Sequence, residues 1–226
     1  LAMRKPQAAG SFDQLALEYS EEISFVDWAR YSLYTGESIP SLGQAYARLL
    51  EVVCAAREEL NHRFAQAVVQ WSPTAGSGVI PGENILREVV APAAKIQPVL
   101  LIVLDGMSLA VFRELSLDLG AHGWVVANFE GQTKIHAAVA PLPTVTEHAR
   151  RSLLCGRIDS EVGEVAGFAA NPDLAEVSAR THQPLLFLKG DLMDPAEGGL
   201  SKELRDEIGS AKRRVVGVVV NAVDDL

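Results

Sequence analysis

Three short stretches of the sequence place side chains suited to phosphate chemistry at the ends of apolar runs or the start of a helix. In the first stretch, the run Val99–Leu104 ends on Asp105 and Gly106. A carboxylate is a hard oxygen ligand for cations, and a glycine allows a tight turn and a close approach of a ligand to the backbone. Asp105 is therefore a candidate metal ligand and Gly106 a candidate substrate contact. The alternative is that Asp105 or Ser108 only caps the following helix.

The second stretch reads Pro-Thr-Val-Thr-Glu-His and begins a predicted helix. Thr144 and Glu147 have the spacing of a capping box, which predicts Thr144 as the N-cap and places Thr146 in the first turn. Free backbone N–H groups and the positive helix end would then face an anion near the Thr146 hydroxyl, and phosphate is the natural guest. The box also explains Thr144 and Glu147 without any chemistry. A threonine hydroxyl attacks only when a base or metal withdraws its proton, and the spacing assigns no base.

In the third stretch, the apolar run Val215–Val220 is followed by Asn221, Asp224 and Asp225. Two carboxylates after a buried strand can bind a cation, and a surface turn would use the same residues. Ligands collect at the carboxyl ends of parallel strands, so the three stretches together indicate one site more strongly than each does alone.

The elements that must position these residues follow an α/β pattern from residue 98 onward. Short apolar runs alternate with helical segments, which predicts a mostly parallel sheet flanked by helices. The expected strands are Val99–Leu104, Gly123–Phe129, Ile135–Ala140, Leu185–Leu188 and Val215–Val220. The expected helices are Ser108–Leu119, Val145–Leu154, Asp173–Ala179 and Lys202–Ser210, whereas Asp159–Gly167 and Asp194–Ser201 have the composition of loops.

Residues 1–97 have helical periodicity instead. A helix is expected from Ser11 to Tyr34, a long amphipathic helix from Ser41 to Trp71, and a shorter one over Glu83–Val90 that ends before Pro92. We therefore expect two domains, a helical bundle segment over 1–97 and an α/β domain over 98–226. The helical segment contains no cluster of titratable side chains, so a packing scaffold or a partner surface is its expected role.

Composition and charge argue against some classes of protein function. The formal charge of −9, from 29 acidic and 20 basic residues, argues against a surface that grips nucleic acid everywhere, although a local basic face remains open. The apolar runs are much shorter than the ~18 residues of a membrane span, so no contact with a membrane is expected. Cys54 and Cys155 suit two reduced thiols and a cytoplasmic location. The pattern at both ends suggests a fragment of a longer protein.

The three stretches, in their order along the chain, resemble the PglZ family of BREX phage-resistance systems. The matching residues are Val-Leu-Asp105-Gly106-Met, Pro143-Thr-Val-Thr146 with Cys155-Gly156 closing the helix, and Asn221-Ala-Val-Asp224-Asp225. The resemblance covers about residues 98–226, and residues 1–97 resemble the helical segment of PglZ proteins loosely. It implies an incomplete alkaline-phosphatase-like core in the α/β domain.

The resemblance also implies roles for individual residues. Asp105 would bind one of two divalent metals, usually zinc, Thr146 would be the nucleophile between them, and Asp224 with Asp225 would begin the second metal site. His148 and Arg150 would contact the substrate. The expected activity is phosphoryl or phosphodiester hydrolysis in phage defence, with DNA as substrate and other BREX proteins as partners.

The family's remaining metal ligands, an Asp-His pair and two further histidines, do not follow in this sequence. We therefore expect this chain alone to hold no zinc and to be inactive. The competing hypothesis is a catalytically silent scaffold subunit that binds other defence proteins of a BREX complex. A third is a phosphomutase or sulfatase relative, although the sulfatase motif Cys-x-Pro-x-Arg is missing.

Overall fold

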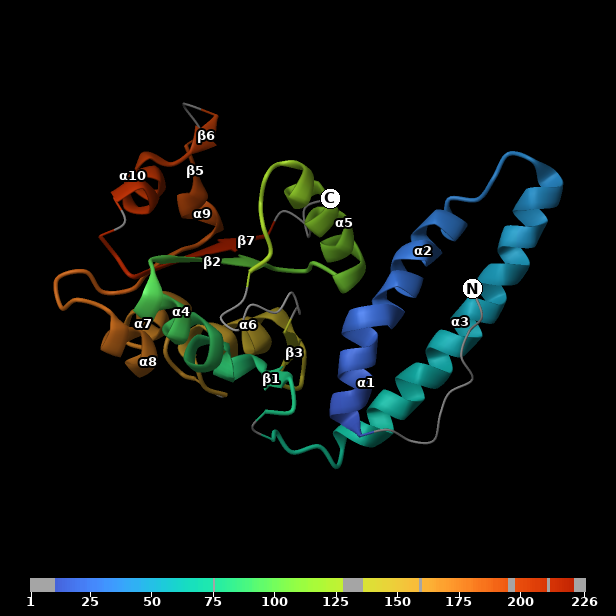
Figure 1. Cartoon of the computed structure of the whole chain (residues 1–226), viewed down its shortest axis with the longest axis horizontal. Coiled ribbons are helices and arrows are strands. Elements are labelled where there is room, and N and C mark those ends of the chain that lie inside the picture. Colours follow the sequence, from blue (N-terminus) through green and yellow to red (C-terminus); the bar gives the residue numbers. More distant parts are fainter. Residues whose placement is uncertain are drawn as a thin grey trace. The chain divides into compact units, whose positions relative to one another are not determined.

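The computed structural model describes residues 11–74, 76–127, 136–158, 160–194, 198–210 and 212–221. Two compact units are present, each built from two separate stretches of sequence (Figure 1). The helical unit comprises Leu1–Val79 and Ser108–Ala137, and the α/β unit comprises Ile80–Met107 and Ala138–Leu226. This division differs from the expected boundary at residue 98. Residues 80–97 belong with the sheet, and the segment that follows the first strand of the sheet belongs with the helices.

The helical unit is built from long helices. Its elements are α1 (Phe12–Glu18), a π-helical turn η1 (Tyr19–Ile23), α2 (Ser24–Tyr34), α3 (Pro40–Val68) and α5 (Leu109–Ala121). The first three follow one another without a break, which confirms the helix expected to end at Tyr34. It begins as predicted, because the Ser11 hydroxyl accepts a hydrogen bond from the backbone N–H of Gln14 at 3.3 Å.

Aromatic packing and one arginine hold this unit together. The rings of Phe12 and Phe64 meet edge to face at 5.8 Å between centroids, which joins α1 to α3. Arg113 of α5 donates to the Ser24 hydroxyl at 2.6 Å and to the carbonyl oxygen of Ser20 at 3.0 Å. Because these bonds satisfy groups near the junction of η1 and α2, α5 belongs to the helical unit and not to the sheet.

The α/β unit is organised around a three-stranded parallel sheet. The strand order is β2 (Val99–Leu104), β7 (Val215–Val220) and β4 (Leu185–Phe187). β2 and β7 pair along their whole length, from Val99 opposite Val215 to Leu104 opposite Val220. The coarse prediction of an α/β unit with parallel strands flanked by helices is therefore confirmed.

The remaining elements of this unit are short. The further strands are β1 (Val79–Pro81) paired with β3 (Ala137–Val139), and β5 (Met193–Asp194) paired antiparallel with β6 (Gly199–Leu200). The helices are η2 (Gly82–Asn84), η3 (Leu86–Val90), α4 (Ala91–Ile96), α6 (Thr146–Cys155), α7 (Glu164–Ala169), α8 (Pro172–Val177), α9 (Lys189–Leu192) and α10 (Lys202–Ser210).

Apolar side chains cover both faces of the central strand β7, which explains why it is apolar throughout, whereas Leu100 and Ile102 of β2 are 38% and 49% exposed. Val215 and Val219 pack into a cluster with Phe168, Leu154 and other buried side chains of η3, α4 and α8. Val216 and Val218 point to the opposite face, into a smaller cluster built on α9 and α10. A strand buried on both sides loses polar positions altogether, as parallel strands commonly do.

Three predicted elements differ in the structure. Residues 123–127 of the expected strand Gly123–Phe129 form no strand, and Val125 is 86% exposed, because no neighbouring strand covers it; residues 128 and 129 lie outside the described residues. The expected strand Ile135–Ala140 shrinks to β3 and lies outside the main sheet. The helix expected to stop before Pro92 continues into α4, since a proline is tolerated in the first turn of a helix.

Within the described parts of the chain, every helix is too short or too polar to cross a membrane.

Candidate functional site

The carboxyl ends of β2 and β7 bring the first and third stretches of the sequence into contact. The backbone N–H of Asp105 donates to the carbonyl oxygen of Val220 at 2.9 Å, so the strand pairing continues one residue past β2. The side-chain amide of Asn221 donates to Asp105 Oδ2 at 3.3 Å. Gly106 follows with a φ of 73°, a left-handed conformation that provides the predicted tight turn.

Arg150 of α6 completes this cluster. Its Nη1 lies 2.7 Å from Asp105 Oδ2, while Nε and Nη2 bind the two carboxylate oxygens of Glu164 at 2.9 and 3.1 Å. The side chains of Arg150, Asp105 and Glu164 are 21%, 13% and 12% exposed. We call Asp105, Arg150, Glu164 and Asn221 the Asp105 network. All three predicted stretches contribute to it, the second through Arg150.

The charges of the Asp105 network do not cancel. Hydrogen bonds from Arg150 to Glu164, and then those to Asp105, raise the pKa of Arg150, whereas burial acts in the opposite direction. The guanidinium is therefore fixed in its charged form. One cation faces two carboxylates, so the network has an excess of negative charge at the carboxyl edge of the sheet.

The start of α6 differs from the predicted capping box. Val145, not Thr144, is the N-cap, and its carbonyl oxygen accepts from the N–H groups of His148 and Ala149 at 3.0 and 2.9 Å. The helix begins one residue later than expected, which moves Glu147 out of the position from which a capping box closes. The prediction that Thr144 is the N-cap was therefore wrong. Thr146 does lie in the first turn, as predicted, and is exposed.

Thr146 and Arg150 are four residues apart on α6, so they lie on one face of the helix about one turn apart. Because Arg150 contacts Asp105, the Thr146 hydroxyl lies on the helix face that is anchored to the Asp105 network. In the described structure the side chain of Val145 does not cap α6, and the N–H groups of Thr146 and Glu147 precede the first N–H that the Val145 carbonyl oxygen accepts. An exposed hydroxyl next to uncapped N–H groups and a positive helix end is suited to an oxyanion.

The structure says less about the roles of the other predicted site residues. His148 is half-buried on α6, and its carbonyl oxygen accepts a hydrogen bond from the Ser152 hydroxyl at 2.7 Å. Gly156 ends α6 in the left-handed conformation with a φ of 71°, as its position after Cys155 predicts. Asp224 and Asp225 lie outside the described residues.

The described residues do not by themselves fit a divalent metal. Asp105 Oδ2 already accepts from Arg150 and Asn221, and a guanidinium on that oxygen repels a metal ion. In the stretches that the structure describes, no group of three or more His, Cys, Asp or Glu side chains is placed to hold one. Zinc sites use three or four protein ligands per ion. The metal role of Asp105 therefore remains a prediction that depends on other residues.

Sequence reasoning missed Glu164, which makes the bidentate contact with Arg150. It is the first residue of α7, inside the segment expected to be a loop. Gly167 in this segment has a packing role, because a Cβ there would lie 2.3 Å from the Sγ atom of Cys155. A short acidic helix start was the only signal in the sequence.

The chain matches no protein-family model, and no curated protein matches its sequence at a significant level.

Proposed function

We propose that the α/β unit is the N-terminal part of an alkaline-phosphatase-like, PglZ-like domain, and that the complete protein hydrolyses phosphate esters or diesters in phage defence. DNA is the proposed substrate, the cytoplasm the proposed location, and other BREX proteins the proposed partners. The observation that supports this proposal is the contact of Arg150 with Asp105 at 2.7 Å. Through it, the helix that begins at Thr146 is anchored to the end of β2.

In this proposal, Thr146 accepts the phosphoryl group. Its hydroxyl oxygen forms a bond to phosphorus while the bond from phosphorus to the leaving oxygen breaks, and the hydroxyl proton passes to the solvent. Water then hydrolyses the phosphothreonine. The N–H groups of Thr146 and Glu147, in the first turn of α6, would hold the non-bridging phosphate oxygens. Arg150 acts as a positioning residue, since its guanidinium is hydrogen-bonded to Asp105 and Glu164 in the described structure.

The two divalent metals implied by the resemblance are proposed as cofactors of the complete protein. Asp105 is one proposed ligand, with Asp224 and Asp225 as others. Because Arg150 binds the same carboxylate, Asp105 would have to exchange Arg150 for the metal. The positioning role of Arg150 does not depend on that exchange, whereas attack by Thr146 needs a base or a metal to withdraw the hydroxyl proton before it reaches the solvent.

The test is hydrolysis of bis-p-nitrophenyl phosphate by the complete protein, with metal content measured by elemental analysis. Thr146→Ala should abolish turnover, while Thr144→Ala, two residues away and outside α6, should keep it. Both variants should melt at nearly the same temperature as the parent. Full activity in Thr146→Ala would refute the nucleophile, and loss of activity in both variants to the same extent would assign the effect to the fold of this segment.

A catalytically silent scaffold is the second candidate, and the closed contacts of Arg150 favour it. A carboxylate already paired with an arginine is a common way to stabilise a fold, and it needs no ligand. The scaffold predicts that the Thr146→Ala protein still protects cells from phage. The hydrolase predicts loss of protection with an unchanged level of the protein.

A further inference from the structure

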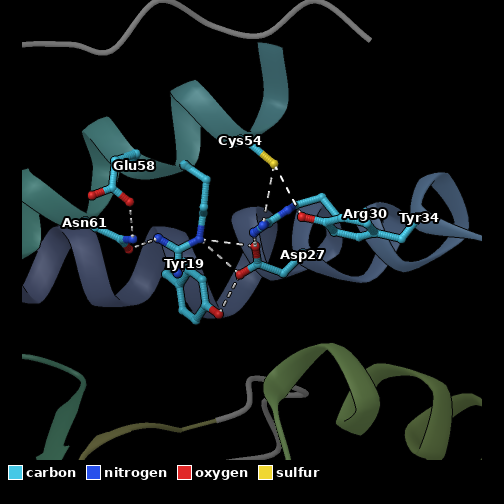
Figure 2. Close-up of polar contacts among 8 residues, drawn as sticks. Tyr19, Asp27, Arg30, Tyr34, Cys54, Glu58 and Asn61 are labelled. Atoms are coloured by element: carbon cyan, nitrogen blue, oxygen red, sulfur yellow. Dashed lines mark hydrogen bonds and ion pairs between the residues drawn. The ribbon is translucent and has the colours of Figure 1, made fainter. Parts of the chain in front are cut away.

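The helical unit contains a cleft of 250 Å³ that is independent of the Asp105 network. It lies along η1, α2 and α3 and reaches the start of α5, and Figure 2 shows the polar contacts beside it. Aromatic, charged and amide side chains make up most of its wall. The lining residues are Tyr19, Asp27, Arg30, Tyr31, Tyr34, Arg57, Asn61, Ser108 and Ala110.

Asp27 is the centre of the contacts in this cleft. Both oxygens of its carboxylate accept a hydrogen bond from Arg57 Nε at 3.1 Å. The carboxylate also accepts from Arg30 Nη1 at 3.1 Å and from the Tyr19 hydroxyl at 2.8 Å (Figure 2). Two guanidinium groups thus share one carboxylate. The arrangement leaves one positive charge in excess on the cleft wall, where the arginine side chains are only 19% and 26% exposed.

The two arginines are held in place before any ligand arrives. Arg57 lies over the Tyr19 ring, 5.0 Å from its centroid, and also donates to Asn61. The carboxylate of Glu58 accepts from Asn61 at 3.3 Å, and its side chain is 66% exposed, so solvent screens its charge. An arginine that is already ordered loses little conformational entropy when an anion binds.

Arg30 has hydrogen-bonding capacity left. Its contacts are with Tyr34 and Asp27, both of which raise its pKa, and with Cys54 Sγ, which lies 3.7 Å from Nη2. Within the described structure, its buried Nε has no hydrogen-bond partner. A buried donor without an acceptor lowers stability, so a small shift of the side chain that turned Nε to the cleft would let a ligand oxygen satisfy it.

We propose that this cleft binds a small oxyanion that carries an aromatic ring. The guanidinium forks of Arg30 and Arg57 match the oxygens of a carboxylate or a phosphate, which share this chemistry. The rings of Tyr31 and Tyr34 are 56% and 62% exposed and offer flat surfaces for the aromatic part. The volume of 250 Å³ admits one ring with its head group.

The experiment is a calorimetric titration of the whole chain with phenyl phosphate, benzoate and inorganic phosphate. Phenyl phosphate or benzoate should bind, and the stronger of the two identifies the head group. Inorganic phosphate should bind at least about tenfold more weakly, since it lacks the ring. Absence of binding by all three probes up to about 5 mM would overturn the proposal.

Three variants locate the binding. Arg30→Met should weaken the binding of the preferred ligand at least about tenfold, while Arg48→Met, an exposed arginine of the same helix as Arg57 but outside the cleft, should leave it unchanged. Tyr34→Ala should weaken the binding of the ring-bearing ligand and leave the binding of inorganic phosphate unchanged. Because Tyr34 is exposed, this variant tests the site even if Arg30→Met does not fold. Equal affinities in the parent, Arg30→Met and Tyr34→Ala would refute the assignment.

Thr146→Ala separates this proposal from the proposed hydrolase. It should bind the ring-bearing anion as the parent does, because Thr146 belongs to the α/β unit and the cleft to the helical unit. If Thr146→Ala loses binding and Arg30→Met keeps it, the anion site is that of the hydrolase and not this cleft.

Discussion

Both units contain ion pairs between arginine and a carboxylate, but one has two arginines for one carboxylate and the other has two carboxylates for one arginine. In the helical unit Arg30 and Arg57 share Asp27, and in the α/β unit Asp105 and Glu164 share Arg150. The first network has an excess of positive charge and the second an excess of negative charge. Counting ion pairs would treat them as equivalent, whereas the unmatched charge predicts that one attracts anions and the other cations.

The networks also differ in what they require of the fold. Asp27 and Arg30 are three residues apart on one helix, so only Arg57 has to come from a second element. The Asp105 network draws on β2, α6, α7 and the end of β7. The first network therefore depends on one helix pair, and the second on the assembly of the whole parallel sheet.

The largest effect is expected from removing the single cation of the Asp105 network. Arg150→Met leaves two largely buried carboxylates without a cation, although Asn221 still donates to Asp105, and should lower the free energy of unfolding by about 3 kcal/mol, measured by urea denaturation. The control is Arg157→Met at an exposed arginine, which should change the free energy of unfolding by less than about 0.5 kcal/mol. Added MgCl₂ should restore part of the loss, more than NaCl of the same ionic strength. Equal effects of both salts would contradict the charge argument.

The corresponding change in the helical unit is Asp27→Asn, which leaves two guanidinium groups side by side. We expect a loss of about 2 kcal/mol, smaller because an amide oxygen still accepts a hydrogen bond. Here phosphate, not a divalent cation, should restore stability. The control is Asp118→Asn on α5, whose side chain is 69% exposed. Rescue of Asp27→Asn by MgCl₂ would mean that the two networks do not differ in the way their charges indicate.

The sequence predicts the strands that position the Asp105 network but not how they are ordered. Val99–Leu104 and Val215–Val220 are recognisable as short runs without polar positions, which are common in parallel sheets, although only β7 is buried on both faces and Leu100 and Ile102 of β2 are exposed. Their apolar side chains are interchangeable, so nothing in the pattern states that β7 lies between β2 and β4. The strand ends were therefore predicted as candidates, while the contact of Asp105 with Asn221 required the structure.

The helical unit shows a different limit of sequence reasoning. Periodicity predicts α2 and α3 well, since apolar residues recur at helical spacing. It predicted no cluster of titratable side chains in this segment and so missed the one formed by Asp27, Arg30 and Arg57, because periodicity says nothing of how two helices are rotated against each other. The fact that α5 joins this unit rests on the contacts of Arg113 with Ser24, which no local pattern encodes.

An effect of about 1 kcal/mol should distinguish the two helix starts near the predicted site residues. Ser108 caps α5, with its hydroxyl accepting from the Val111 N–H at 3.2 Å, whereas Thr144 caps nothing. Ser108→Ala should therefore cost about 1 kcal/mol in chemical denaturation, and Thr144→Ala less than about 0.5 kcal/mol. A larger loss for Thr144→Ala than for Ser108→Ala would restore the capping box predicted from the sequence.

The smallest effect concerns the pH dependence of the Asp27 contacts. Burial, and secondly the hydrogen bond to Asp27, raise the pKa of Tyr19 above 10.0. The unfolded chain then loses the phenol proton before the folded chain does. Its contribution to stability is therefore complete below about pH 10 and is lost as the pH rises through the raised folded pKa.

Tyr19→Phe isolates that contribution. Both proteins should be compared by urea denaturation at about pH 8 and about pH 10.5, on either side of the unfolded phenol pKa. The parent should lose more stability than the variant over this interval, by a few tenths of a kcal/mol to about 1 kcal/mol, since one pKa unit corresponds to about 1.4 kcal/mol at most. Tyr31→Phe on α2 controls for the loss of a hydroxyl from an exposed ring. If parent and Tyr19→Phe lose stability in parallel, burial and the hydrogen bond to Asp27 do not hold the proton on the Tyr19 hydroxyl.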